Sequence, residues 1–414
     1  MEPRPRVIDL FCGAGGLSEG FVSAGFDVRL GLDNDPLAMD AYRVNHQHRG
    51  LLADVAEVNG RDLLDEAGLA EVDILIGSPA CQGFSTHGRR NGWVRDDDPR
   101  NLLYRQYARL VGELKPSWFV LENVAGLLYF DRGSFYRRLT AEFEQHGYSV
   151  EGKLVLAADY GVPQLRRRLL VIGNRVGAAA PFPTQTHMGA YRRDTLALWD
   201  RRLSESPWLK PHATVHDAIS DLPGLGTAGS ASTYGSRSVS RLQVELRAGR
   251  RTLEDHDVTQ LSDSHERLIR MVPSGGTWRD IPEHLLPERF SRIPRTNYTN
   301  LFARLSWDRP SYTITTQFNN VTTGCYTHPD EHRALSPREG ARLQTFPDRF
   351  KFGTGNSRYR LIGNAVPPLL GRAAASALLR EMDKGVVPIR KPSRDDLPDA
   401  KLEFGINEGW KKAI

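Results

Sequence analysis

Short apolar runs and amphipathic stretches alternate along the first 175 residues of the chain. The apolar runs have the length of buried strands, and the amphipathic stretches have the spacing of helices that pack on a sheet. The predicted strands are Val7–Phe11, Asp27–Leu32, Leu51–Asp54, Val72–Ile76, Trp118–Leu121 and Leu169–Ile172. The predicted helices are Leu17–Ala24, Pro36–Asn45, Asn101–Leu114 and Ser134–His146. This order predicts an α/β fold with a doubly wound, mostly parallel sheet that binds ligands at the carboxyl ends of its strands.

The pattern changes beyond residue 175, where Pro, Gly and Ser become frequent and arginines are scattered. We predict a second, smaller and irregular domain over residues 176–354. Helical spacing returns at Arg338–Gln344 and at Pro368–Met382. Residues 355–383 are expected to complete the first domain, which residues 1–175 begin, and residues 384–414 are expected to form a tail.

Composition and charge narrow the class of protein. The 414 residues are 40% hydrophobic and 25% charged, without an apolar run that could cross a bilayer, so a membrane protein is not expected. No charged-then-apolar leader precedes the first strand, which favours a cytoplasmic location. The net charge of +5 favours a polyanionic partner only weakly. Cys12, Cys81 and Cys325 are too far apart for a zinc knuckle, so neither a metal site nor a disulfide framework is expected.

A glycine-rich turn follows the first predicted strand. Gly13 and Gly15 allow the backbone to approach a ligand closely, because they have no side chain. Such turns bind nicotinamide, flavin and adenosylmethionine cofactors alike, and some only pack a helix on a strand. Asp33 ends the second strand, where a carboxylate can accept hydrogen bonds from ribose hydroxyls. Asp54 either accepts from an adenine amine or caps a loop. Together these residues favour a ligand that contains adenosine.

Reactive side chains fall at successive strand ends. Cys81 lies in the loop Gly77–Ser85 after one predicted strand, and Glu122 follows the next. Arg166 and Arg168 occupy alternate positions before the last strand, so they share a face. A lone cysteine is more often an inert buried residue, and each of the other groups has an ordinary structural explanation. Their convergence at one edge predicts a nucleophile, an acid and cations of an active site.

A set of ordered motifs carries a family resemblance. The chain contains, in this order, DLFCGAGG, PACQGFS, ENV, QLRRR, RALSPREGARLQTFPD and GNAVPP. These motifs resemble those of the cytosine-5 DNA methyltransferase family from about residue 7 to residue 380. The resemblance implies the adenosylmethionine-dependent methyltransferase fold, S-adenosyl-L-methionine as the cofactor and a target-recognition domain in the irregular region. It implies a monomeric enzyme that methylates carbon 5 of cytosine in double-stranded DNA, the modification partner of a restriction endonuclease that shares its site.

The resemblance also implies roles for individual residues. Cys81 would add to carbon 6 of a flipped-out cytosine, and Glu122 would protonate N3 from a dry pocket. Arg168 would contact O2 of the base, and Arg166 would hold the cysteine loop. The implied cofactor-binding residues are Phe11, Gly13, Gly15, Asp33, Asp54, Pro79, Asn364 and Val366. The implied DNA-binding residues are Gln82, Ser85, Arg89 and Arg90.

One residue departs from the family pattern. Ala80 stands where proline usually precedes the cysteine. Alanine restores a backbone N–H and loosens φ, so we expect a less rigidly held loop with unchanged chemistry.

Three other functions stay open. A DNA-binding regulator without catalysis is opposed by the intact Cys81, Glu122 and Arg168. An enzyme that acts on RNA is opposed only by the long variable region, which suits the reading of a duplex. A nicotinamide dehydrogenase would explain the glycine turn and Asp33, but neither PACQGFS nor QLRRR.

Overall fold

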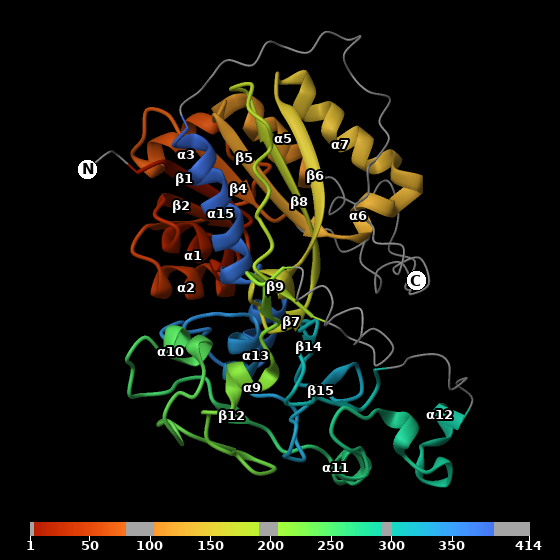
Figure 1. The fold of residues 1–414 in the computed structure, drawn as a ribbon. Helices are drawn as coiled ribbons and strands as arrows, with labels where there is room; N and C mark the ends of the chain where they lie inside the picture. The colour runs from red at the N-terminus through yellow and green to blue at the C-terminus, as the bar shows by residue number, and fades with distance from the viewer. Residues whose placement is uncertain (1–3, 80–102, 190–205, 292–299, 385–414) are drawn as a thin grey trace.

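A seven-stranded sheet forms the centre of the larger lobe (Figure 1). The computed structural model describes residues 4–79, 103–189, 206–291 and 300–384. In spatial order the strands are β3 (Arg49–Leu52), β2 (Asp27–Asp33), β1 (Arg6–Leu10), β4 (Ile74–Gly77), β5 (Trp118–Val124), β8 (Arg167–Asn174) and β6 (Ser149–Leu156). The strands from β3 to β5 pair in parallel, which confirms the predicted doubly wound, mostly parallel sheet.

The strand that begins at the predicted arginine pair, β8, is antiparallel to both of its neighbours. These neighbours are β5 and β6, and Arg168 lies opposite Val124 at the end of β5. For a parallel strand, the residues at the ligand-binding edge of the sheet are those that come directly after the strand in the sequence. Arg166 and Arg168 reach that edge because they lie where the antiparallel β8 enters the sheet.

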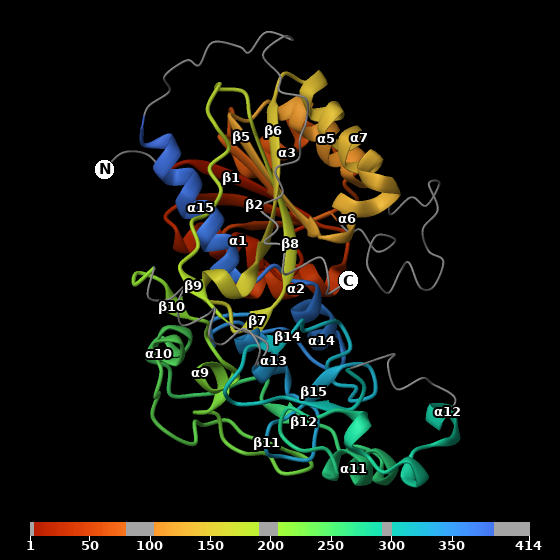
Figure 2. The same ribbon diagram turned by 45° about the vertical axis from the view of Figure 1, so that its right-hand side comes forward.

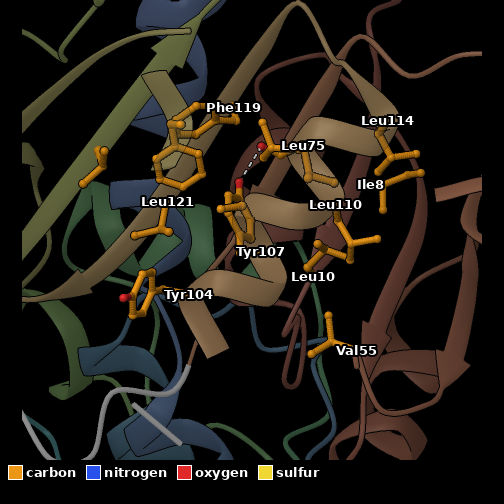
Figure 3. Packing of buried hydrophobic residues seen from close by; sticks show 14 of the residues in the cluster. Ile8, Leu10, Val55, Leu75, Tyr104, Tyr107, Leu110, Leu114, Phe119 and Leu121 are labelled. Atoms are coloured by element: carbon orange, nitrogen blue, oxygen red, sulfur yellow. Dashed lines mark hydrogen bonds between the residues drawn. The ribbon is translucent and has the colours of Figure 1, made fainter. Parts of the chain in front are cut away.

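Helices cover both faces of the sheet (Figures 1 and 2). One face packs against α3 (Gly60–Ala67), α5 (Leu103–Leu114) and α7 (Ser134–Gln145), and the other against α1 (Gly16–Ser23) and α15 (Pro368–Met382). Successive residues of a strand enter opposite cores, as Val7 and Ile8 do in β1. Figure 3 shows Tyr107 in the first of these cores, where its hydroxyl donates to the Leu75 carbonyl at 2.9 Å.

The second lobe consists of short helices and strands. Its helices are α9 (Val215–Ile219), α10 (Arg241–Arg247), α11 (Asp263–Arg270), α12 (Glu288–Ser291), α13 (Pro337–Leu343) and α14 (Ser357–Asn364). Its strand pairs are β11 (Gly229–Ser230) with β12 (Asp257–Val258) and β13 (Ala303–Arg304) with β15 (Cys325–Thr327). Two further pairs join segments before and within it: β9 (His187–Met188) with β10 (Lys210–Pro211), and β7 (Gln164–Leu165) with β14 (Ser311–Tyr312). Over the described ranges, every helix is too short or too polar to span a membrane.

Local chemistry explains where several predicted elements begin and end. The helix α2 (Pro36–Asn45) has its predicted bounds, because the Asp35 side chain accepts from the Leu37 N–H and Pro36 suits the first turn. The first strand ends before Phe11, which has a φ of 58°. The strand predicted to reach Asp54 is β3, which ends at Leu52. β6 was not predicted, since most of this edge strand is solvated and lacks a continuous apolar run.

The chain crosses back from the second lobe to the first near its end. α14 contributes Tyr359 and Ile362 to a core that also contains Leu343 and Phe346. The next helix, α15, packs along α1 on the sheet. The segment between α14 and α15 therefore lies where the two lobes meet, and the predicted tail beyond residue 384 lies outside the described residues.

Candidate active site

The turn after β1 is built from left-handed backbone conformations. Phe11, Gly13 and Gly15 have φ values of 58°, 55° and 89°. Glycine adopts such values readily, whereas a bulky residue is strained there, a feature that clusters at ligand sites. A Cβ on Gly13 would meet nothing within 4 Å, but one on Gly15 would lie 2.1 Å from His46 Nε2. The turn is therefore open at Gly13 and tightly packed at Gly15.

The predicted ribose-binding carboxylate holds this turn in place. Asp33 Oδ2 accepts from the Gly13 N–H at 2.9 Å, and its Oδ1 accepts from the Asp35 N–H at 2.9 Å. Burial raises the pKa of Asp33, and the backbone donors partly oppose that rise. Since Asp33 and the glycine turn are fixed to each other, one ligand can reach both.

The other residues predicted near the adenosine lie at the same end of the sheet. Asp54 is exposed, and its Oδ1 accepts from the Ala56 N–H at 2.9 Å, so the loop-capping role is present. Phe11 is half-buried against the core that contains Tyr107. Pro79 is buried, and its carbonyl accepts from Asn123 Nδ2 at 3.0 Å. Binding of a cofactor by these residues stays a prediction.

The C-terminal segment returns to the glycine turn. A Cβ on Gly16 would lie 2.3 Å from the Val366 carbonyl oxygen, so this position tolerates no side chain. Val366 is buried, whereas Asn364 is exposed at the end of α14. Residues from the two ends of the sequence thus meet at one site, as the predicted cofactor-binding set requires.

The predicted acid and one predicted arginine are in direct contact. The Glu122 side chain is 4% exposed, and its Oε1 lies 2.8 Å from Arg168 Nε. The Ser78 hydroxyl donates to Glu122 Oε2 at 2.5 Å. Burial lowers the pKa of Arg168, and the adjacent Glu122 carboxylate opposes this shift. β4, β5 and β8 therefore bring a hydroxyl, a carboxylate and a guanidinium together at one edge of the sheet.

The second predicted arginine binds backbone carbonyls. Arg166 is buried and donates to Ile314, Gly363 and Ala365 at 2.9, 3.1 and 3.0 Å. Burial and the nearby charge of Arg168 both lower the pKa of Arg166. These bonds tie the start of β8 to the second lobe and to the returning C-terminal segment. The predicted contact of Arg166 with the cysteine loop involves residues outside the described ranges.

The predicted nucleophile and DNA-binding residues also lie outside the described residues. These residues are Cys81, Gln82, Ser85, Arg89 and Arg90, and Ala80 lies there too. The described part of their loop ends at Pro79. Because Ser78 bonds to Glu122 and Pro79 bonds to Asn123, the loop leaves the sheet beside the predicted acid.

Sequence reasoning missed two polar residues of this region. Ser78 immediately follows β4, and the parallel register that pairs Gly77 with Leu121 brings Ser78 next to Glu122. A hydroxyl at the first position after a strand was the available signal. Thr345 has a φ of 68°, and its hydroxyl accepts from the Leu369 N–H at 3.1 Å in the first turn of α15. No local sequence pattern predicts that Thr345 caps α15, which lies far away in the sequence.

Comparison with known families gives a match across most of the chain. Residues 5–380 match the family model described as C-5 cytosine-specific DNA methylase. The Type II methyltransferase M.AgeI of Thalassovita gelatinovora is 33% identical over 90% of this chain and 99% of its own length. The Type II methyltransferase M1.HphI of Haemophilus parahaemolyticus is 35% identical over 90% of this chain and 86% of its own length.

Solved structures share the fold. A DNA modification methyltransferase encoded within an E. coli prophage superposes with a TM-score of 0.68 at 23% identity, over 92% of this chain and 99% of that one. The Dnmt2 methyltransferase of S. pombe gives a TM-score of 0.55 at 16% identity, over 92% of this chain and 100% of that one. At these identities the structural likeness concerns the fold alone.

Proposed function

This chain belongs to the C-5 cytosine-specific DNA methylase family, and from that premise we propose that it methylates carbon 5 of cytosine within a specific duplex DNA sequence. The observation that carries the proposal is the buried contact between Glu122 and Arg168 at the point where the loop of Cys81 leaves the sheet. A buried carboxyl group and a guanidinium at a sheet's ligand-binding edge can transfer a proton to a bound base and stabilise the charge that develops.

S-adenosyl-L-methionine is the proposed cofactor, and the residues around the glycine turn fit it. Gly13 borders open space, and the Asp33 carboxylate is bonded to this same turn. The proposed contacts are Phe11, Gly13, Gly15, Asp33, Asp54, Pro79, Asn364 and Val366. When bound, the cofactor supplies an electrophilic methyl group. Asp33 and the open backbone at Gly13 would orient its nucleoside part, since the carboxylate oxygens can accept further hydrogen bonds where the backbone can be approached closely.

The protein residues supply the activation of the base. Cys81 Sγ bonds to carbon 6 of cytosine, which makes carbon 5 electron-rich, and Glu122 gives a proton to N3 as this bond forms. Arg168 holds O2 of the base while it neutralises the carboxylate that remains. After methylation a base removes the proton from carbon 5, the bond between Cys81 and carbon 6 breaks, and N3 returns its proton to Glu122. The thiolate is regenerated.

The proposed substrate is a base rotated out of double-stranded DNA. The reacting atoms are hidden within a stacked duplex, so the enzyme has to flip the cytosine into the site. Gln82, Ser85, Arg89 and Arg90 are proposed to contact the DNA from the cysteine loop. The relatives named as Type II methyltransferases support a role as the modification enzyme of a restriction–modification system. We propose that the chain acts as a monomer.

The test is bisulfite sequencing of DNA from cells that express the protein, with Cys81→Ala as the control. We expect unconverted cytosines in one short sequence context, and their disappearance in the control. Complete conversion in both samples would contradict the proposed function. Protection that persists in Cys81→Ala would contradict the covalent mechanism.

A further inference from the structure

The two oxygens of the Glu122 carboxylate have different surroundings. Oε2 accepts the hydroxyl proton of Ser78 in a short hydrogen bond of 2.5 Å. Oε1 is buried and, among the described residues, no donor makes a directed hydrogen bond to it. Arg168 Nε lies 2.8 Å from Oε1, so that contact is an ion pair without hydrogen-bond alignment. A buried oxygen whose nearest cation is not aligned for a hydrogen bond leaves a position for a ligand.

The sheet fixes this asymmetry. Gly77 pairs with Leu121, and a Cβ on Gly77 would lie 2.7 Å from both the Leu10 carbonyl oxygen and the Tyr107 ring. Ser78 is therefore the first position after β4 that can carry a side chain toward the neighbouring strand. Its N–H is 3.4 Å from the Leu10 carbonyl oxygen, which extends the pairing with β1. The hydroxyl is held by backbone on the same rigid sheet that carries Glu122.

We propose that Ser78 is a positioning residue for the acid: it occupies Oε2 of Glu122, so that Oε1 is the oxygen presented to N3 of the flipped cytosine. This inference rests on the proposed function. With cytosine bound, Oε1 carries a proton and Arg168 turns to O2 of the base. As the bond from Cys81 to carbon 6 forms, the O–H bond at Oε1 breaks and an N–H bond forms at N3. The electron pair stays on Glu122, whose carboxylate then receives the Ser78 hydrogen bond and the Arg168 charge.

The hydrogen bond should act on the rate and not on substrate binding. A hydroxyl binds an ionised carboxylate more strongly than a protonated one, so Ser78 stabilises the charge that Glu122 gains during the proton transfer. An interaction that strengthens only in the transition state changes kcat and leaves KM unaltered. Loss of a hydrogen bond to a charged group should reduce kcat by roughly 10- to 100-fold.

The experiment compares Ser78→Ala and Ser78→Thr with the wild-type chain. Ser23→Ala is the matched control, because Ser23 is exposed on α1 and its hydroxyl donates to the Gly20 carbonyl, away from Glu122. Each variant is assayed for kcat, for KM of DNA and cofactor, and for release of tritium from carbon 5 of cytosine in DNA without cofactor. The last assay reports on the activation of the base alone. Thermal unfolding checks that all variants fold.

We expect Ser78→Ala to lower kcat and tritium release by the same factor, with KM unchanged, and Ser78→Thr to restore most of the rate. Ser23→Ala should behave as wild type. A Ser78→Ala variant with wild-type kcat, or with only a raised KM, would overturn the inference while wild-type methylation still supports the proposed function. A wild-type chain that methylates no cytosine would overturn the proposed function itself.

Discussion

Two buried clusters of arginine and carboxylate groups in this molecule differ in how fully they are bonded. In the second lobe, Arg342 donates to both oxygens of Asp348 at 2.9 and 2.6 Å and pairs with Asp221. Tyr234 adds a further donor to Asp348 at 2.7 Å. At the sheet edge, Glu122 is equally buried, yet its Oε1 has no directed donor among the described residues. A saturated cluster holds the fold, and an unsaturated one leaves an atom for a ligand.

Burial therefore does not separate a functional carboxylate from a structural one, whereas the pattern of its bonds does. Burial alone would raise the pKa of Asp348, but the hydrogen bonds and charge of Arg342 lower it. This carboxylate is ionised and inert. Four substitutions test how far the contrast extends.

The largest effect is expected for Glu122→Gln. The amide retains the shape of the side chain and an acceptor for Ser78, but it cannot give a proton to N3. General acid catalysis contributes on the order of 100-fold or more, so methyl transfer to DNA should fall by at least that factor. The measurement is the incorporation of labelled methyl groups into DNA, beside a thermal unfolding curve. A folded variant with normal activity would remove Glu122 from the active site.

The next effect is expected for Arg342→Met in the saturated cluster. Methionine fills much of the volume but removes the nearest counter-ion of Asp221 and Asp348. Among the described residues, these carboxylates keep only the longer ion-pair contacts, with Arg247 at 3.5 Å and Arg338 at 3.8 Å respectively. Breaking a buried ion pair in this way costs about 3–5 kcal/mol of the free energy of unfolding. Urea denaturation followed by circular dichroism gives this quantity, and kcat should be normal wherever the variant remains folded. A stable variant with reduced kcat would reverse the roles assigned to the two clusters.

The sequence predicts the acid and its cation better than it predicts how they are held. Glu122 and Arg168 could be placed because strand ends converge at one edge whatever the details of packing. The antiparallel course of β8 could not, since nothing in its local pattern reports the direction of a partner strand. Ser78 and Thr345 act through residues far away in the sequence. Such contacts depend on register and on lobe placement, which hydrophobic periodicity does not encode.

Asp9 is another buried carboxylate with an unpartnered oxygen among the described residues, and it is not one of the predicted ligand contacts. Its Oδ2 accepts from the Ser18 hydroxyl at 2.6 Å, whereas its Oδ1 has no partner among the described residues. Burial, and secondarily the charge of Asp33, raises the pKa of Asp9 from 3.8 to about 7. Here protonation, and not a ligand, relieves the cost of the buried charge.

The consequence is a pH dependence of stability that Asp9→Asn should remove. The folded chain binds the Asp9 proton more tightly than the unfolded chain does, so this residue's contribution falls as pH rises from about 4 to about 7 and is level above. The loss across this window is on the order of 4 kcal/mol. Unfolding free energies of the wild-type and Asn variants between these pH values give the difference directly. Parallel curves for the two proteins would show that Asp9 does not titrate in this range.

The smallest effect is expected for Arg372→Met, the exposed counterpart of Arg342→Met. Arg372 of α15 pairs with Glu245 of α10 across the two lobes, and their side chains are 40% and 41% exposed. Solvent screens such a pair, so its loss should change the free energy of unfolding by less than about 1 kcal/mol, and by still less at high salt. The same urea titration measures it. If this variant were destabilised as strongly as Arg342→Met, charge pairing alone would account for both results. Burial with full hydrogen bonding would then no longer distinguish the structural cluster around Arg342 from an exposed ion pair. The missing hydrogen bond at Glu122 Oε1 would no longer be evidence for a ligand site.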